Sequence, residues 1–240
     1  MSKLGIFDSG LGGYSIASAI HKQYPKQDIV YLADQKNVPY GNKSNEELIS
    51  IVLNNLNWFK EQGVTSVLIG CNTSSVLNLK VEGMQITGII DLTASQIKEE
   101  KEIIVIATSA TIRSHAYAKA IRERRETVVH EVAMPNLASL IENLATKEEV
   151  LKELDDCLKL FKNSHIPAIL ACTHYPLVKG YIEEYLQSYT YDSLTPVLES
   201  ELFTVGEGTF VCYTTADPAF FDKKVQALMN EKVESIFVEI

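Results

Sequence analysis

Two cysteines stand where an apolar run of the sequence ends and polar side chains begin. Cys71 follows the run 67–70, and Cys172 follows the run 166–171. Such a pattern is typical of a buried strand that leaves the core at its carboxyl end. In open α/β sheets, ligands bind at that edge. The sequence therefore predicts two thiols at two strand ends, each within reach of a ligand.

The chemistry of two such thiols differs from that of one. A thiol at a strand end beside a helix start is expected to have a pKa below the value of about 8.5 of free cysteine. If the two thiols face each other across a cleft, one thiolate can remove a proton from a carbon while the other thiol protonates its opposite face. This exchange inverts a stereocentre without a metal or a cofactor. Asp8 and His174 would orient the thiols or share their protons. Neutral donors for a substrate carboxylate are predicted at Ser9, Tyr40, Gly41, Asn72, Thr73, Thr111 and Thr173.

Other interpretations of the cysteines and histidines remain open at this point. A buried cysteine is most often a small apolar side chain, and we apply this interpretation to Cys157 and Cys212. A zinc site is chemically possible, although the sequence has no close ligand pair such as C-x-x-C. Its ligands would be Cys71, Cys172, His174 and Asp8. Surface or packing roles are expected for the other histidines, which are His21, His115, His130 and His165.

Composition narrows the class of protein. The 240 residues are 46% hydrophobic, but no apolar run approaches the roughly 20 residues of a membrane span. No signal-peptide core precedes the first predicted strand, so a cytoplasmic protein is expected. The net charge of −9 argues against nucleic acid or an anionic membrane as a partner. A small anionic substrate remains compatible with that charge.

Strand and helix patterns alternate along the chain, which predicts an α/β fold. We expect two similar α/β domains with mainly parallel sheets that face each other across a cleft. The first would comprise residues 1–92 and be completed by 208–240, and the second would comprise 93–207. Ser44 and Glu47 form a capping-box pattern for a helix over 45–62, and a further helix is predicted over 75–81. The glycine-rich turn 8–13 fits either anion binding by backbone N–H groups or a turn that needs positive φ.

Several of these stretches, in this order, resemble the cofactor-independent glutamate racemases of the aspartate/glutamate racemase superfamily. The resemblance extends over nearly the whole chain and includes both cysteines. The matching stretches are 5–13, 32–34 with 39–41, 71–73, 107–111 with Arg113, Ser114 and Tyr117, 172–177, and 213–218 with Phe221.

The resemblance implies an activity and roles for particular residues. It implies that the protein interconverts L- and D-glutamate without a cofactor and that it is a homodimer. The D-glutamate would go into bacterial peptidoglycan. Cys71 would be the base for the D-substrate and Cys172 the base for the L-substrate. Glu142 aligns with a glutamate that assists one cysteine, although the stretch 134–142 departs from the usual family pattern. The implied substrate-binding residues are Asp8, Ser9, Pro39, Tyr40, Gly41, Asn72, Thr73, Thr111, Thr173 and His174.

Two rivals to glutamate racemisation remain. The first is a racemase for aspartate or another acidic amino acid. The second is a protein without catalytic activity that binds an acidic metabolite in the cleft.

Overall fold

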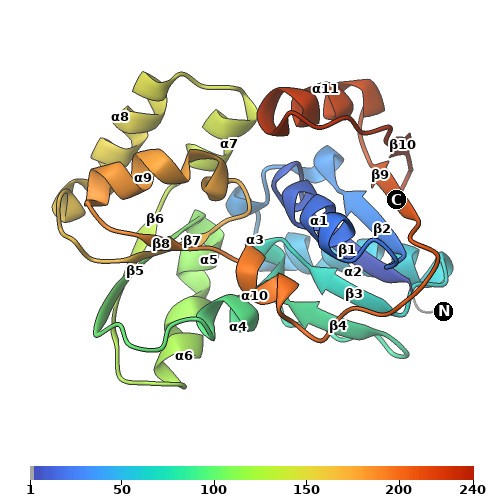
Figure 1. Ribbon diagram of the computed structural model, residues 1–240, viewed down its shortest axis with the longest axis horizontal. Helices are drawn as coiled ribbons and strands as arrows, with labels where there is room; N and C mark the ends of the chain where they lie inside the picture. Colours follow the sequence, from blue (N-terminus) through green and yellow to red (C-terminus); the bar gives the residue numbers. More distant parts are fainter. Residues whose placement is uncertain (1–2) are drawn as a thin grey trace.

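A computed structural model describes residues 3–240 of the chain, and within them the strands form two parallel sheets. The first sheet has six strands in the order β10-β9-β2-β1-β3-β4, and the second has four in the order β6-β5-β7-β8. Figure 1 shows the two sheets side by side, each with its helices. The α/β fold with mainly parallel sheets that the sequence predicted is confirmed.

The first sheet draws its strands from both ends of the chain. Its strands are β1 (Leu4–Asp8), β2 (Ile29–Ala33), β3 (Ser66–Ile69), β4 (Gln85–Gly88), β9 (Phe210–Thr214) and β10 (Ile236–Phe237). The second sheet is formed by β5 (Glu102–Ala107), β6 (Val128–Ala133), β7 (Ala168–Ala171) and β8 (Thr190–Tyr191). Because β9 pairs with β2, the C-terminal segment returns to the first sheet. The division into two domains with boundaries at residues 92 and 207 stays a prediction.

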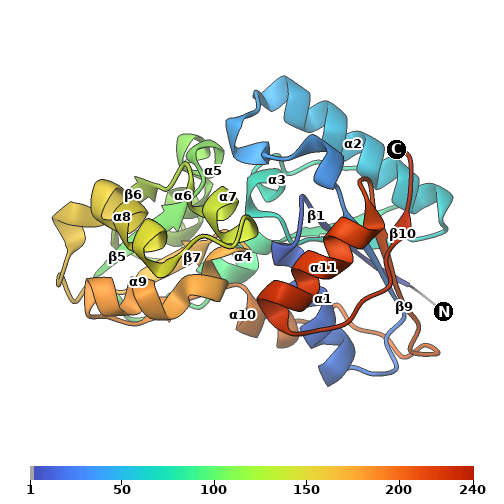
Figure 2. The same cartoon turned by 90° about the horizontal axis from the view of Figure 1, so that it is seen from above.

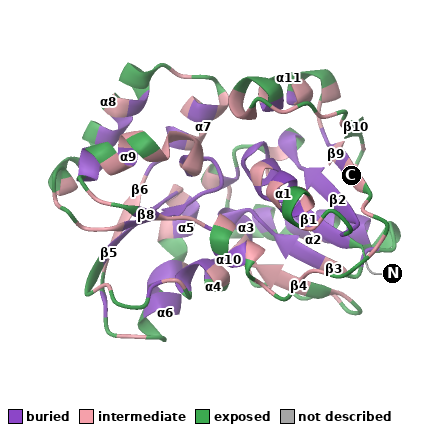
Figure 3. Cartoon of the chain, viewed as in Figure 1, coloured by how far each residue is buried: buried purple, intermediate pink, exposed green. Residues whose placement is uncertain are grey.

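Helices cover both faces of each sheet because alternate residues of the central strands point to opposite sides. In β1, Ile6 belongs to the core under α1 (Gly12–Gln23) and α11 (Pro218–Met229), while Phe7 belongs to the core under α2 (Asn45–Glu61). Figure 2 shows α1 and α11 on one side of the first sheet and α2 on the other. Buried residues concentrate in the strands and on the inner helix faces (Figure 3).

The second sheet is packed in the same way. Helices α7 (Leu137–Glu142), α8 (Lys147–Leu158) and α9 (Lys179–Leu186) cover the face that carries Ile104 and Leu170. Helix α6 (Ala116–Arg122) covers the face that carries Ile103 and Val105. The remaining helices are α3 (Asn72–Ser75), α4 (Ile89–Ala94), α5 (Ser109–Ser114) and α10 (Leu194–Leu198). Single turns of 3₁₀ helix occur at η1 (Gln35–Asn37), η2 (Tyr40–Asn42), η3 (Lys159–Phe161) and η4 (Tyr175–Val178).

Of two helices predicted from local sequence patterns, one is confirmed and one is wrong. The capping box of α2 is confirmed, since Ser44 accepts from the backbone N–H of Glu47 and Glu47 accepts from the N–H of Ser44. The helix predicted over 75–81 is wrong: α3 ends at Ser75, and Asn78 has a left-handed φ of 46°, which a helix cannot accommodate. In the part of the chain that the structure describes, no helix is long and apolar enough to cross a membrane.

Candidate active site

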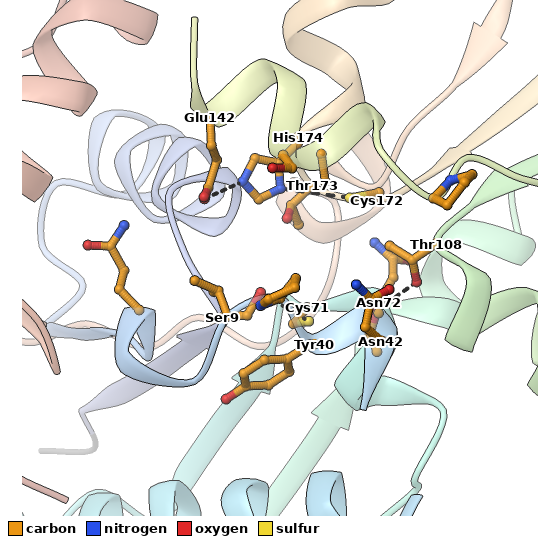
Figure 4. A pocket seen from close by; sticks show the side chains of 18 of the residues that line it. Ser9, Tyr40, Asn42, Cys71, Asn72, Thr108, Glu142, Cys172, Thr173 and His174 are labelled. Carbon is orange, nitrogen blue, oxygen red and sulfur yellow. Dashed lines mark hydrogen bonds and ion pairs between the residues drawn. The ribbon is translucent and has the colours of Figure 1, made fainter. Parts of the chain in front are cut away.

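A cavity of about 380 Å³ lies at the carboxyl ends of strands from both sheets. Cys71 lies two residues after the end of β3, and Cys172 directly follows β7. Both thiols line this cavity, one from each sheet, and Figure 4 shows them on opposite walls. The sequence predicted two thiols at two strand ends, and the structure brings them into one cavity.

The Cys71 thiol lies in an environment that disfavours its charged form. Its Sγ donates to the Oγ of Ser9 at 3.7 Å, and the residue is only 5% exposed. Burial, and after it the nearby carboxylate of Asp8, raise the pKa of Cys71 to about 12. The expectation of a lowered pKa is therefore wrong for Cys71. Helix α3, which begins beside it, is only four residues long, so its terminus and the Ser74 and Ser9 donors offset the burial only in part.

The Cys172 thiol has a different set of neighbours. Its Sγ lies 3.7 Å from Nδ1 of His174, and Nε2 of His174 lies 2.8 Å from Oε1 of Glu142. Burial favours the neutral imidazole, but the hydrogen bonds and charges of Cys172 and Glu142 outweigh it and raise the pKa of His174 well above its usual 6.5. A protonated His174 can donate to both neighbours at once. Cys172, His174 and Glu142 thus form a chain of polar contacts, drawn in Figure 4.

Glu142 is held as a carboxylate by the same contacts. Burial alone would raise its pKa, yet the hydrogen bond from His174 and the charge of that ring lower it. The backbone N–H of Leu11 donates to the same Oε1 at 3.4 Å, and Lys224 adds a smaller lowering effect. The family resemblance implied that Glu142 assists one cysteine. In the structure, it contacts the histidine beside Cys172.

Asp8 lies behind the cavity wall at the end of β1. Burial raises its pKa, while the charge of His174, the N–H of Gly10 at 2.9 Å and the hydroxyl of Thr173 at 3.1 Å oppose this effect. The glycine-rich turn that follows Asp8 serves close packing. A Cβ on Gly12 would lie 2.7 Å from the carbonyl carbon of Thr173. None of the glycines in this turn is among those with positive φ, so the positive-φ interpretation is wrong.

Hydroxyl and amide groups cluster next to Cys71. The Oγ1 atoms of Thr73, Thr108 and Thr111 lie within 2.9 to 3.3 Å of one another. Asn72 accepts from the hydroxyl of Tyr117 at 2.5 Å, while its Nδ2 is buried without a hydrogen-bond partner in the described residues. Because a buried donor without a partner is costly, this amide is suited to bind an acceptor that enters the cavity.

The wall beside these groups is formed by a loop that a buried carboxylate organises. Asp34 accepts hydrogen bonds from Asn37, from the hydroxyl of Tyr40 at 2.5 Å, from Asn55 at 3.1 Å and from Thr215 at 2.8 Å. All four donors are neutral. They fix the segment 35–42, so that residues 39–41 line the cavity.

Most residues singled out from the sequence reach this cavity. Asp8 and Thr111 do not line it but bond to Thr173 and Thr73, which do. The lining set includes Ser9, Pro39, Tyr40, Gly41, Cys71, Asn72, Thr73, Glu142, Cys172, Thr173 and His174.

The cysteines and histidines given packing or surface roles lie elsewhere. Cys157 is in α8, Cys212 is buried in β9, and neither lines the cavity. His21, His115, His130 and His165 are absent from the cavity wall as well. Within residues 3–240, no three His, Cys, Asp or Glu side chains come together as a candidate metal site.

Sequence reasoning missed the contribution of α11. Phe220 and Lys224 of this helix line the cavity, four residues apart and therefore on one helix face. The spacing was visible in the sequence, but periodicity does not tell which cavity a helix face meets. Asn42 and Ser139 are further lining residues without a sequence signal.

The chain is similar in sequence and in fold to known proteins. Residues 14–199 match the model of a protein family described as Asp/Glu/Hydantoin racemase. A glutamate racemase of Aquifex aeolicus is 33% identical to the chain over 97% of its length and 96% of that protein. The crystal structure of glutamate racemase isoform RacE1 from Bacillus anthracis has a TM-score of 0.89 and 28% identity, covering 100% of this chain and 98% of that one. A glutamate racemase structure from Francisella tularensis in complex with D-glutamate has a TM-score of 0.89 and 26% identity, covering 99% and 97% of the two chains.

Proposed function

The chain belongs to the Asp/Glu/Hydantoin racemase family and is an isomerase of that type, and from this premise we propose that it interconverts L-glutamate and D-glutamate. One observation carries the proposal. Cys71 from the first sheet and Cys172 from the second line a single cavity on opposite walls. A two-base proton transfer at one carbon needs two groups in this arrangement, because a proton removed from one face must be replaced on the other.

The proposed reaction is a transfer of one proton at each thiol. In the L-to-D direction, the Cys172 thiolate takes the α-proton of L-glutamate. The Cys71 thiol gives its proton to the opposite face of the α-carbon, so Cys71 ends as a thiolate and Cys172 as a thiol. The reverse direction exchanges the two roles. A protonated His174, 3.7 Å from Sγ of Cys172, stabilises the thiolate on that side.

On the other side, the substrate itself would activate the thiol. The high pKa of Cys71 reflects its burial and the nearby carboxylate of Asp8. The ammonium group of glutamate brings a positive charge next to these groups and favours the Cys71 thiolate. The buried amide of Asn72 and the hydroxyls of Thr73 and Thr108 would bind the α-carboxylate and stabilise the carbanion-like transition state. Asp8 and Thr111 would hold Thr173 and Thr73 in place.

The proposal extends to the setting of the reaction. The enzyme would work without a cofactor and act as a homodimer in the cytoplasm, with neither nucleic acid nor a membrane as partner. Its D-glutamate would supply peptidoglycan. Ser9, Pro39, Tyr40 and Gly41 would bind the substrate from the wall beside Cys71.

Circular dichroism of the amino acid separates this proposal from its rivals. Purified protein, dialysed against a chelator and given no cofactor, is incubated with L-glutamate and in parallel with L-aspartate. We expect the optical signal of L-glutamate to decay to zero and that of L-aspartate to persist. Decay with L-aspartate alone would favour the aspartate racemase. No decay with any acidic amino acid would favour the binding protein, and activity that returns only with added metal would contradict the cofactor-free mechanism.

A further inference from the structure

A single lysine stands out on the cavity wall. Among the described residues that line the cavity, Lys224 is the one lysine or arginine. The other groups there are neutral donors, two thiols, the Glu142 carboxylate and the His174 ring, which is engaged by Cys172 and Glu142. The chain carries a net charge of −9, so its overall field repels a small anion. A local cation at the cavity would therefore attract a small anion that the overall field repels.

Helix α11 places this lysine between the two sheets. Phe220, Lys224 and Leu228 follow one another at intervals of four residues and so share one face of α11. Phe220 and Lys224 line the cavity, and Leu228 packs against the cores of both sheets. Figure 1 shows α11 reaching from the first sheet toward α7. This face of α11 thus forms part of the rim where the cleft opens.

The ammonium group of Lys224 is positioned but not neutralised. Its Nζ lies 4.4 Å from the centre of the Phe220 ring, a cation–π contact that holds it at the rim. Phe220 itself is 50% exposed, so the pair borders solvent. Lys224 makes no ion pair within the described residues. Its charge lowers the pKa of Glu142, and this effect is smaller than that of His174.

We propose that Lys224 is the residue that captures the anionic substrate at the rim of the cavity and pairs with its side-chain carboxylate. This inference rests on the proposed function, since it assigns the charge preference of that same site. An ammonium held by a ring face keeps its charge free for a carboxylate, which a lysine already paired with Asp or Glu would not. The neutral groups inside the cavity can bind a carboxylate but cannot attract one from a distance. Lys224 therefore adds selection for an acidic side chain.

The test compares Lys224→Met and Lys224→Arg with the wild type in racemisation of L-glutamate. Methionine keeps the apolar stem on Phe220 but removes the charge, whereas arginine keeps the charge. We expect kcat/KM of Lys224→Met to fall about tenfold at about 10 mM salt, with kcat and the shape of the pH profile unchanged. The deficit should shrink toward zero at about 1 M salt, where the screening length is about 3 Å. Lys224→Arg should keep most of the wild-type kcat/KM.

A matched control is available on the same helix. Lys223 is exposed and does not line the cavity, so Lys223→Met makes the same change in net charge one position away. We expect it to leave kcat/KM at the wild-type value. Equal values for Lys224→Met and Lys223→Met would overturn the inference. So would a loss of kcat with a shifted pH profile in Lys224→Met, because the lysine would then act through Glu142.

Calorimetric binding of D-glutamate separates failure of this inference from failure of the proposed function. If the wild type racemises nothing, the proposed function fails, and the dissociation constants still test the lysine. We expect Lys224→Met to weaken binding of D-glutamate about tenfold and to leave binding of D-glutamine, whose side chain is uncharged, unchanged. Equal loss for both ligands would overturn the assignment of charge selection to Lys224.

Discussion

The two thiols of the cavity have unlike neighbours. Cys172 faces an imidazole whose pKa is raised well above 6.5, whereas Cys71 faces a hydroxyl and the Asp8 carboxylate. In the proposed mechanism, the cavity is therefore arranged for the L-substrate, with a cation beside Cys172 and a protonated Cys71. The D-substrate depends on its own ammonium group to lower the pKa of Cys71.

The division of labour between the thiols leads to the first prediction. Cys71→Ser and Cys172→Ser should each lower racemisation by at least about 10³-fold, because a hydroxyl is a far poorer base than a thiolate. Loss of chloride from a 3-chloroglutamate needs only one base. Cys71→Ser should therefore still release chloride from the enantiomer with the L configuration at the α-carbon, and Cys172→Ser from the D enantiomer.

Two cysteines outside the cavity provide the controls for this experiment. Cys157→Ser and Cys212→Ser should retain wild-type racemisation, because neither thiol lines the cavity. A double variant with serine at both Cys71 and Cys172 that still racemised glutamate would sink the two-thiol mechanism.

The second prediction concerns the contact between His174 and Glu142. In Glu142→Gln, the pKa of His174 should fall, because the carboxylate that favours the imidazolium is gone. The alkaline limb of kcat/KM for L-glutamate should then move to lower pH, and a ¹⁵N NMR titration of the His174 ring should move in the same direction. An unchanged limb together with an unchanged NMR titration would contradict the role of this pair.

The contact between His174 and Glu142 also makes the free energy of unfolding depend on pH. The lowered pKa of Glu142 contributes stability that is present above its unfolded value of 4.5 and lost as pH falls through the folded pKa. The raised pKa of His174 contributes stability that is complete below 6.5 and lost as pH rises through the folded pKa. The stability difference between wild type and Glu142→Gln should therefore be largest between about pH 4.5 and 6.5, measured by urea unfolding.

Among the elements, the turn from β1 to α1 approaches the second sheet closely. A Cβ on Gly12 would meet the Thr173 backbone, and one on Gly10 would lie 2.6 Å from Oε1 of Glu142. These glycines allow the end of β1 to lie directly against the residues that surround Cys172. The spacing of the two sheets at the cavity therefore depends on the absence of a side chain at Gly10 and Gly12.

The third prediction tests this packing with one substitution at two places. Gly12→Ala should cost about 1–3 kcal/mol of stability and lower kcat, because the new Cβ pushes Thr173 away and widens the distance between the thiols. Gly180→Ala in α9 is the control, since nothing lies within 4 Å of its added Cβ. It should stabilise the protein by about 0.5–1 kcal/mol with unchanged kcat. Wild-type activity in Gly12→Ala would show that the packing of this turn does not set the site.

The elements also show where sequence reasoning succeeds and where it stops. Apolar runs that end in polar residues located both cysteines, because strand ends depend on a local pattern that the chain carries itself. The capping box of Ser44 and Glu47 is likewise local. The raised pKa of Cys71 was not predictable, since it depends on burial and on Asp8, which is distant in the sequence. For the same reason, the sequence did not show that Lys224 faces the cavity.

At the scale of the whole molecule, the cavity joins groups from two sheets, so a ligand in it ties the sheets together. The fourth prediction follows: D-glutamate at about 100 times its dissociation constant should add about 2.7 kcal/mol of stability. For a chain of this size, this corresponds to a rise in Tm of about 5–10 °C. Differential scanning fluorimetry over a range of D-glutamate concentrations measures it. D-Lysine serves as the control, because its cationic side chain should give no such rise, and a Tm independent of D-glutamate would contradict binding in the cavity.

The return of β9 to the first sheet has a consequence for how the protein is made. Every strand of the second sheet lies in one continuous stretch, Glu102–Tyr191, whereas the first sheet needs β9 (Phe210–Thr214) beside β2. A ribosome adds about 5–20 residues per second, so the second sheet leaves the exit tunnel complete while the first still lacks its C-terminal strands. During synthesis, the second sheet can therefore be completed before the first, although the first begins earlier in the sequence. The half of the molecule that begins first is finished last, because β9 and the helix that carries Lys224 follow every strand of the second sheet.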